Sequence, residues 1–112
     1  MINSVILMGR LTADPDFSQT QNGTAYCRFT VAIDRKFADK TTGQKEADFI
    51  SCTAWGKTAE FVSKYFSKGK MIIVEGSLRN NNYTDSNGVK HYSYNVVADS
   101  VSFGESKSAS NP

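Results

Sequence analysis

Five stretches of the chain have the apolar pattern of β-strands. Residues 5–11 are apolar on both parities over most of their length, which is typical of a strand covered on both faces or pressed against another subunit. Residues 25–34 alternate between apolar and mostly polar side chains after an Asn-Gly turn signal. Residues 47–55, 71–79 and 92–103 also favour strands.

Between the third and fourth predicted strands, the apolar period becomes helical. Residues 58–66 fit a short amphipathic helix, with Thr58 as the predicted N-cap and Gly69 as the glycine that follows the helix. Residues 80–89 are rich in Asn, Asp and Gly and predict a hairpin loop. Three strands, one helix and two strands is the order of a five-stranded Greek-key barrel. The expected fold class is therefore all-β with one helix, a five-stranded OB-fold barrel, although other small β-barrels share this order of elements.

The third predicted strand shows which side chains fill this barrel. Because side chains alternate faces along a strand, Ile50, Cys52 and Ala54 form one set. The other set contains Phe49 and Trp55, separated by small hydroxyl side chains. If the first set is interior, two aromatic rings face outward and need a cover, such as the stacked bases of a nucleic acid. The alternative is that Phe49 and Trp55 are the interior set.

Two further aromatic residues, Phe37 and Tyr83, lie in polar segments that contain few other apolar residues. Each alone could be a loop side chain that folds back onto the barrel. Together with Phe49 and Trp55 they form four aromatic residues on elements that would surround one groove. Basic side chains are interspersed among them, and this combination favours single-stranded nucleic acid. These basic residues are Lys40, Lys57, Lys68 and Arg79.

Composition limits the other possibilities. A length of 112 residues fits one domain, 1–104, followed by a small polar tail, 105–112, that we expect to be disordered. The net charge of +2 is too small to indicate nucleic acid by itself. Cys27 and Cys52 lack metal-ligand spacing, and no export signal or long apolar run is present, which suggests a cytoplasmic protein without membrane contact.

The sequence has no pattern that indicates catalysis. The single histidine, His91, lies in the predicted hairpin arm, where we expect a surface side chain without a helper group. Carboxylates are scattered, and no phosphate-binding glycine loop is present. We therefore expect no enzyme, no cofactor and no metal.

Several short motifs occur together, in a fixed order, along most of the chain. They are Val5-Ile6-Leu7-Met8-Gly9-Arg10-Leu11 with Asp14-Pro15, Trp55-Gly56-Lys57 with Ala59-Glu60, Lys68-Gly69, Glu75-Gly76 with Leu78-Arg79, Thr84-Asp85 and Val96-Val97-Ala98. With these motifs, residues 1 to about 104 resemble the bacterial single-stranded DNA-binding protein family. The resemblance implies the barrel fold, a homotetramer formed as a dimer of dimers by pairing of the first strands, and sequence-independent wrapping of single-stranded DNA during replication, recombination and repair.

The resemblance also implies roles for individual residues. It places the base-stacking rings at Phe37, Phe49, Trp55 and Tyr83, in agreement with the parity argument. The predicted phosphate contacts are Arg10, Lys40, Lys57, Lys68 and Arg79. The predicted subunit interface is Val5, Ile6, Leu7 and Met8. A nucleoid-associated location in a bacterial cytoplasm would follow.

The sequence also departs from the family pattern. Ser18-Gln19 and Asn81-Asn82 stand where basic or aromatic residues are common in the family, which predicts weaker electrostatic attraction to DNA. The chain ends without the acidic tip that recruits replication and repair proteins, so it is either truncated or tailless, and recruitment is not expected of it. Two alternatives stay open: a primosomal replication adaptor on the same barrel, which works through protein partners, and a small barrel nuclease.

Overall fold

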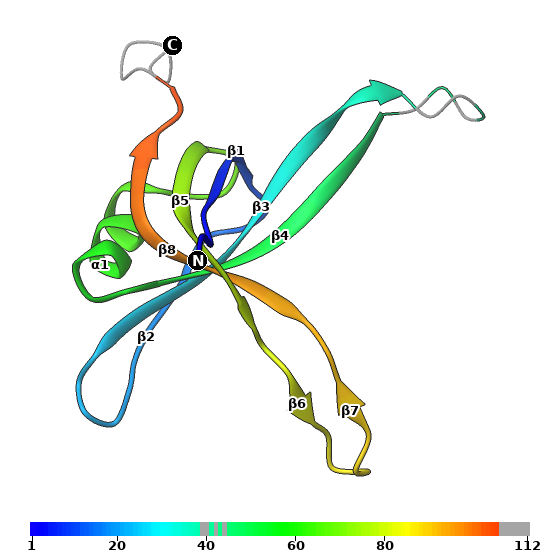
Figure 1. Ribbon diagram of the computed structural model, residues 1–112. Coiled ribbons are helices and arrows are strands. Elements are labelled where there is room, and N and C mark those ends of the chain that lie inside the picture. The colour runs from blue at the N-terminus through cyan, green and yellow to red at the C-terminus, as the bar shows by residue number, and fades with distance from the viewer. Residues whose placement is uncertain (39–40, 42, 44, 106–112) are drawn as a thin grey trace.

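The computed structural model describes residues 1–38, 41, 43 and 45–105, and shows a barrel from which three two-stranded arms extend (Figure 1). The predicted contact Lys40 and residues 106–112 of the predicted tail lie outside the described residues. One helix and eight strands are present in the described part of the chain. They are β1 (Val5–Leu11), β2 (Asp16–Gln19), β3 (Ala25–Ala38), β4 (Lys45–Trp55), α1 (Gly56–Tyr65), β5 (Met71–Asn80), β6 (Tyr83–Thr84), β7 (Lys90–His91) and β8 (Tyr94–Phe103).

Five strands close the barrel in the order β1, β5, β8, β4 and β3, with β3 returning to β1. All neighbours are antiparallel except β4 and β8, which run parallel. This confirms the predicted five-stranded barrel of the OB-fold type. β2 extends the sheet beyond β3, and the sequence pattern did not predict it, because four residues are too few to show an alternation.

Gly9 permits the closure. Beyond it, Arg10 and Leu11 pair with β3 while the rest of β1 pairs only with β5. A Cβ atom at position 9 would lie 2.4 Å from the carbonyl oxygen of Ala32. The close approach of the two backbones at this seam therefore requires glycine.

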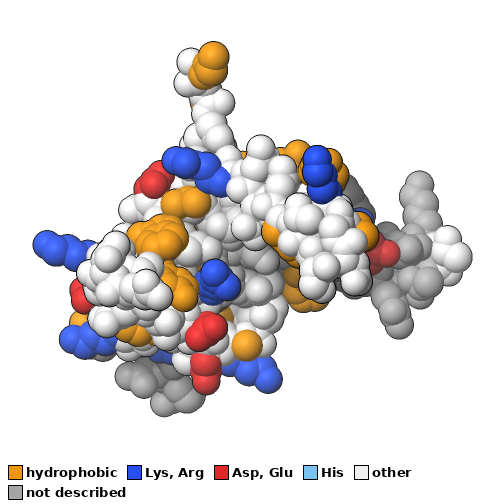
Figure 2. Space-filling model, turned by 90° about the horizontal axis from the view of Figure 1, so that it is seen from below, with side chains coloured by type: hydrophobic (Ala, Val, Ile, Leu, Met, Phe, Trp, Pro, Cys, Tyr) orange, Lys and Arg blue, Asp and Glu red, His pale blue; other side chains and the backbone are white. Residues whose placement is uncertain are grey.

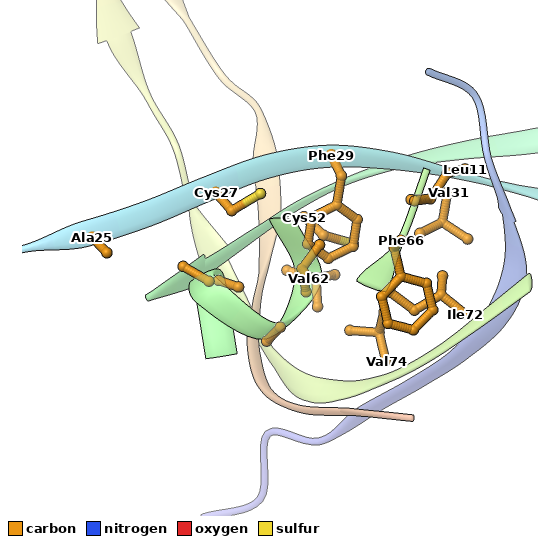
Figure 3. Close-up of a cluster of buried hydrophobic side chains, with 14 residues drawn as sticks. Leu11, Ala25, Cys27, Phe29, Val31, Cys52, Val62, Phe66, Ile72 and Val74 are labelled. Atoms are coloured by element: carbon orange, nitrogen blue, oxygen red, sulfur yellow. The ribbon is translucent and has the colours of Figure 1, made fainter. Parts of the chain in front are cut away.

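The core consists of the inward side chains of the barrel strands, with α1 packed across one end (Figure 3). Cys52 and Ala54 on β4 are buried, as are the odd-numbered positions from Ala25 to Val31 on β3. This confirms the parity predicted for both strands, and the alternative with Phe49 and Trp55 in the interior is wrong. Leu78 shares its parity with buried Val74 but stays 43% exposed, because β5 is leaving the barrel toward an arm.

The helix begins earlier than its sequence pattern indicates. β4 ends at Trp55, and Gly56, with a φ of +60°, turns the chain directly into α1. Trp55 is the N-cap and makes no side-chain capping bond, so the predicted cap at Thr58 is wrong. The helix ends with Phe66 as its C-cap, and Gly69 instead belongs to the turn before β5, where its N–H donates to the carbonyl of Leu11 at 2.8 Å.

Candidate nucleic-acid interface

Two aromatic rings lie side by side on the outer face of the β3–β4 ribbon. Tyr26 pairs with Trp55 across the two strands, and their ring centroids are 5.4 Å apart with a 40° angle between the planes. The guanidinium carbon of Arg28 lies 5.5 Å from the centroid of the Tyr26 ring. Adjacent π-faces beside a cation can stack on bases and neutralise phosphates at the same time.

These side chains form one wall of an open groove of about 1260 Å³. The groove runs from the β2–β3 hairpin, across the outer face of β4, to the end of β5 and the start of β6. Figure 2 shows this end of the molecule hollowed between two projecting hairpins, with a basic side chain in the hollow. Its main aromatic and basic lining residues are Tyr26, Arg28, Trp55, Arg79 and Tyr83.

The floor of the groove is formed by short polar side chains. Ser51 and Thr53 occupy the outward positions of β4 between the two predicted stacking rings. Thr53 is buried, and the Asn95 side-chain amide on the neighbouring strand β8 donates a hydrogen bond to its Oγ1 at 3.0 Å. Because the Thr53 hydroxyl and the Asn95 amide are already paired, and the floor side chains are short, a flat base can approach without displacing a bulky side chain.

The structure brings three of the predicted contacts together and places the others elsewhere. Trp55, Tyr83 and Arg79 line the groove. Phe49 is 67% exposed on the outward face of β4, opposite Ala32, farther along the β3–β4 arm and outside the groove. Phe37 belongs to β3 by its backbone. The predicted stacking surface is thus divided between a groove and an extended arm.

Three other predicted phosphate contacts, Arg10, Lys57 and Lys68, do not line the groove. The Arg10 guanidinium donates to the carbonyl of Gly69 at 2.8 Å and forms an ion pair with Glu105 at 3.1 Å. Lys57 is exposed in the first turn of α1. The backbone N–H of Lys68 donates to the Asp14 carboxylate, which lines the groove, so Lys68 lies close to its rim.

Two lining residues, Tyr26 and Arg28, were not predicted from the sequence. Both occupy the outward parity of β3, which the alternation identifies correctly, but neither stands out on one strand alone. Their importance comes from the register, which sets Tyr26 opposite Trp55 and Arg28 opposite Thr53. An aromatic and a cation at outward positions of the clearest predicted strand were the available signal.

The residues of the predicted subunit interface leave one strand edge open. Val5, Ile6, Leu7 and Met8 pair with β5 on one side, and within the described chain they have no strand on the other. Ile6 is 69% exposed and Met8 is 50% exposed. An apolar strand with an unpaired edge is a template for pairing with another chain.

The two thiols of the interior, Cys27 and Cys52, are buried and stay protonated at neutral pH. Burial raises the pKa of Cys27 to about 11, with a smaller effect of the Asp16 charge, and burial raises the pKa of Cys52 to about 12. In the described ranges, no three His, Cys, Asp or Glu side chains are grouped to hold a metal ion. No helix in the described residues is long and apolar enough to cross a membrane. The lining of the groove offers aromatic rings and cationic side chains, which can bind a polyanion.

Comparison with known proteins agrees with this chemistry. The chain is 48% identical to a single-stranded DNA-binding protein of Fusobacterium nucleatum, over 97% of this chain and 71% of that protein. It is also 48% identical to a single-stranded DNA-binding protein of Bacillus cereus, over 92% of this chain and 60% of that protein. The chain thus spans less than two thirds of the length of the Bacillus cereus protein. Residues 2–104 match the Single-strand binding protein family, and the chain belongs to that family.

Proposed function

We propose that the protein binds single-stranded DNA without sequence preference, by stacking bases on the rings of the groove and the arm. The observation that carries the proposal is the Tyr26–Trp55 pair, which faces an open groove beside Arg28 and Arg79. Every base has a π-face, so ring stacking tolerates any sequence. The relatives named as single-stranded DNA-binding proteins support the same assignment.

The groove favours single strands over a duplex. Stacking on Trp55 or Tyr83 requires a base whose face is free, and in a duplex both faces are covered by neighbouring base pairs. The guanidinium groups of Arg28 and Arg79 have the geometry to contact the phosphates of a strand that lies in the groove. The protein then acts as a binder that covers and protects the strand, and no chemical step on DNA is required of it.

We further propose that the protein works as a homotetramer in which β1 strands of two subunits pair. The backbone edge of Val5–Met8, which no other described strand pairs with, and the exposed side chains of Ile6 and Met8 support this. Pairing of two such edges would satisfy the free backbone groups and cover the apolar side chains together. A second contact between dimers would complete the tetramer.

Trp55 is the single tryptophan of the chain and lies in the groove, so its fluorescence reports occupancy directly. We expect quenching on titration with a thymidine oligonucleotide and no comparable change with a duplex of equal length. The log-log dependence of the affinity on salt should have a slope of about −0.7 per phosphate neutralised. Equal affinity for duplex and single strand, or no quenching at low salt, would refute the proposed function.

A further inference from the structure

The hairpin that carries Tyr83 has an internal arrangement that base stacking alone does not explain. Tyr83 on β6 pairs in register with His91 on β7. Their rings lie nearly parallel, with centroids 4.7 Å apart and an interplanar angle of 11°. His91 therefore covers one face of the Tyr83 ring and sets its orientation beside the groove that Tyr83 lines.

Asp85 fixes the imidazole in this position. Its Oδ2 lies 2.8 Å from Nε2 of His91, while its Oδ1 accepts from the backbone N–H groups of Asn87 and Val89 in the hairpin turn. The hydrogen bond from His91, followed by the one from Val89, lowers the pKa of the Asp85 carboxyl. The carboxylate thus stays ionised in weakly acidic solution and makes Nε2 the protonated nitrogen of a neutral imidazole.

Added acid must then protonate the other ring nitrogen, Nδ1. Within the described residues Nδ1 has no hydrogen-bond partner, and the His91 side chain is 42% exposed. The titratable groups that face the ring are the Asp85 carboxylate and the Tyr83 phenol, while Lys90 precedes it on the opposite face of β7. Protonation would place a positive charge, held by a carboxylate, against the Tyr83 ring, and a cation on a ring face is favourable.

We propose that His91 is a positioning residue that presents the Tyr83 ring to a DNA base, and that its protonation strengthens DNA binding as the pH falls. This inference rests on the proposed binding of single-stranded DNA. The new charge lies next to a ring that stacks on a base, within reach of the phosphates on either side of that base. Histidine ordinarily changes charge between pH 5 and 8, and His91 is the single histidine of the chain.

The direction of the pH effect on DNA affinity follows from linkage. If DNA prefers the protonated form, binding must take up protons, and the affinity must rise on acidification through this range. One added charge a few ångströms from a phosphate in water should tighten binding about fivefold. The magnitude of the salt slope should also increase, by about 0.7 for each phosphate that the imidazolium neutralises.

The test compares the parent protein with His91→Phe, which keeps a ring against Tyr83 and removes the charge. Affinity for a thymidine oligonucleotide is measured by anisotropy between about pH 5.5 and about pH 7.2, a range in which thymine does not ionise. We expect the affinity of the parent to rise about fivefold toward low pH and that of the variant to stay flat. Proton uptake on binding, measured by calorimetry in buffers of different ionisation enthalpy, should occur in the parent alone.

A second variant tests whether the histidine must stand opposite Tyr83 or whether a titratable charge elsewhere in the hairpin is sufficient. His91→Phe combined with Val89→His moves the histidine to an exposed site in the same hairpin, away from the Tyr83 register. We expect this double variant not to regain the pH response. Equal pH dependence in the parent and His91→Phe would overturn the inference, as would full recovery in the double variant. Both results are distinct from failure of the proposed function, in which the parent binds no single strand at any pH.

Discussion

Replacing Trp55 by alanine tests whether the ring serves the groove or the barrel. Trp55 is 46% exposed, packs against Tyr26 and lines the groove. Loss of one stacked base should cost about 1–3 kcal/mol of binding free energy, which weakens the affinity about 5-fold to 160-fold. Removal of a fully buried Trp costs about 3–5 kcal/mol of stability, and we expect about half of that here because half of the ring is exposed.

Tyr65 provides a matched control. It is 44% exposed, and its ring centroid lies 5.0 Å from that of Phe61, but it sits on α1 and does not line the groove. Tyr65→Ala should therefore lower the melting temperature to a similar degree and leave DNA affinity unchanged. Phe29→Ala, at a buried position on the inner face of β3, should destabilise the fold more than either.

The assay uses a labelled thymidine oligonucleotide, since Trp55→Ala removes the intrinsic fluorophore. Affinity is read by anisotropy at a temperature where circular dichroism shows every variant to be folded. The stacking argument is refuted if folded Trp55→Ala binds within about twofold of the parent, well below the loss that one stacked base implies. It is equally refuted if Tyr65→Ala loses as much affinity as Trp55→Ala.

Three further outcomes follow from the geometry. Arg79→Ala should weaken binding to all sequences alike and reduce the salt slope by about 0.7, whereas an unchanged slope would place Arg79 away from phosphate. Ile6→Lys should lower the mass measured by light scattering, because it charges the open edge of β1, and an unchanged mass at micromolar concentration would contradict pairing there. Cys27 and Cys52, with pKa values raised to about 11 and about 12, should resist alkylation at pH 8 until the protein unfolds, so rapid labelling of the folded protein would count against their burial.

Strand parity made much of the site predictable from sequence. The outward position of Trp55 follows from alternation on one strand, because the opposite set of small and apolar residues fits the barrel interior. The partnership of Trp55 with Tyr26 could not be predicted in this way. It depends on the register between β3 and β4, and register is fixed by the turn and by burial across both strands.

The helix start was predicted wrongly and the partners of His91 were not predicted, for different reasons. A threonine before an apolar period is the usual sign of a cap, but here the left-handed turn at Gly56 starts the helix directly after β4. His91 was expected to be a surface residue without a helper group; its side chain is 42% exposed, as expected, but Asp85 is a helper. Its stacking on Tyr83 and its bond to Asp85 both arise from a hairpin pairing of only two residues per strand, which leaves no periodic trace in the sequence.

The position of β8 between β4 and β5 affects how the chain folds during synthesis. β8 is the last strand of the described chain to be translated, yet it supplies the partner for one edge of each neighbour. Contacts between residues far apart in sequence form slowly, and unpaired strand edges promote aggregation in the meantime. The barrel can therefore close only after translation has passed Phe103, and a ribosome stalled before β8 would hold a chain in which β4 and β5 each have an open edge in addition to that of β1.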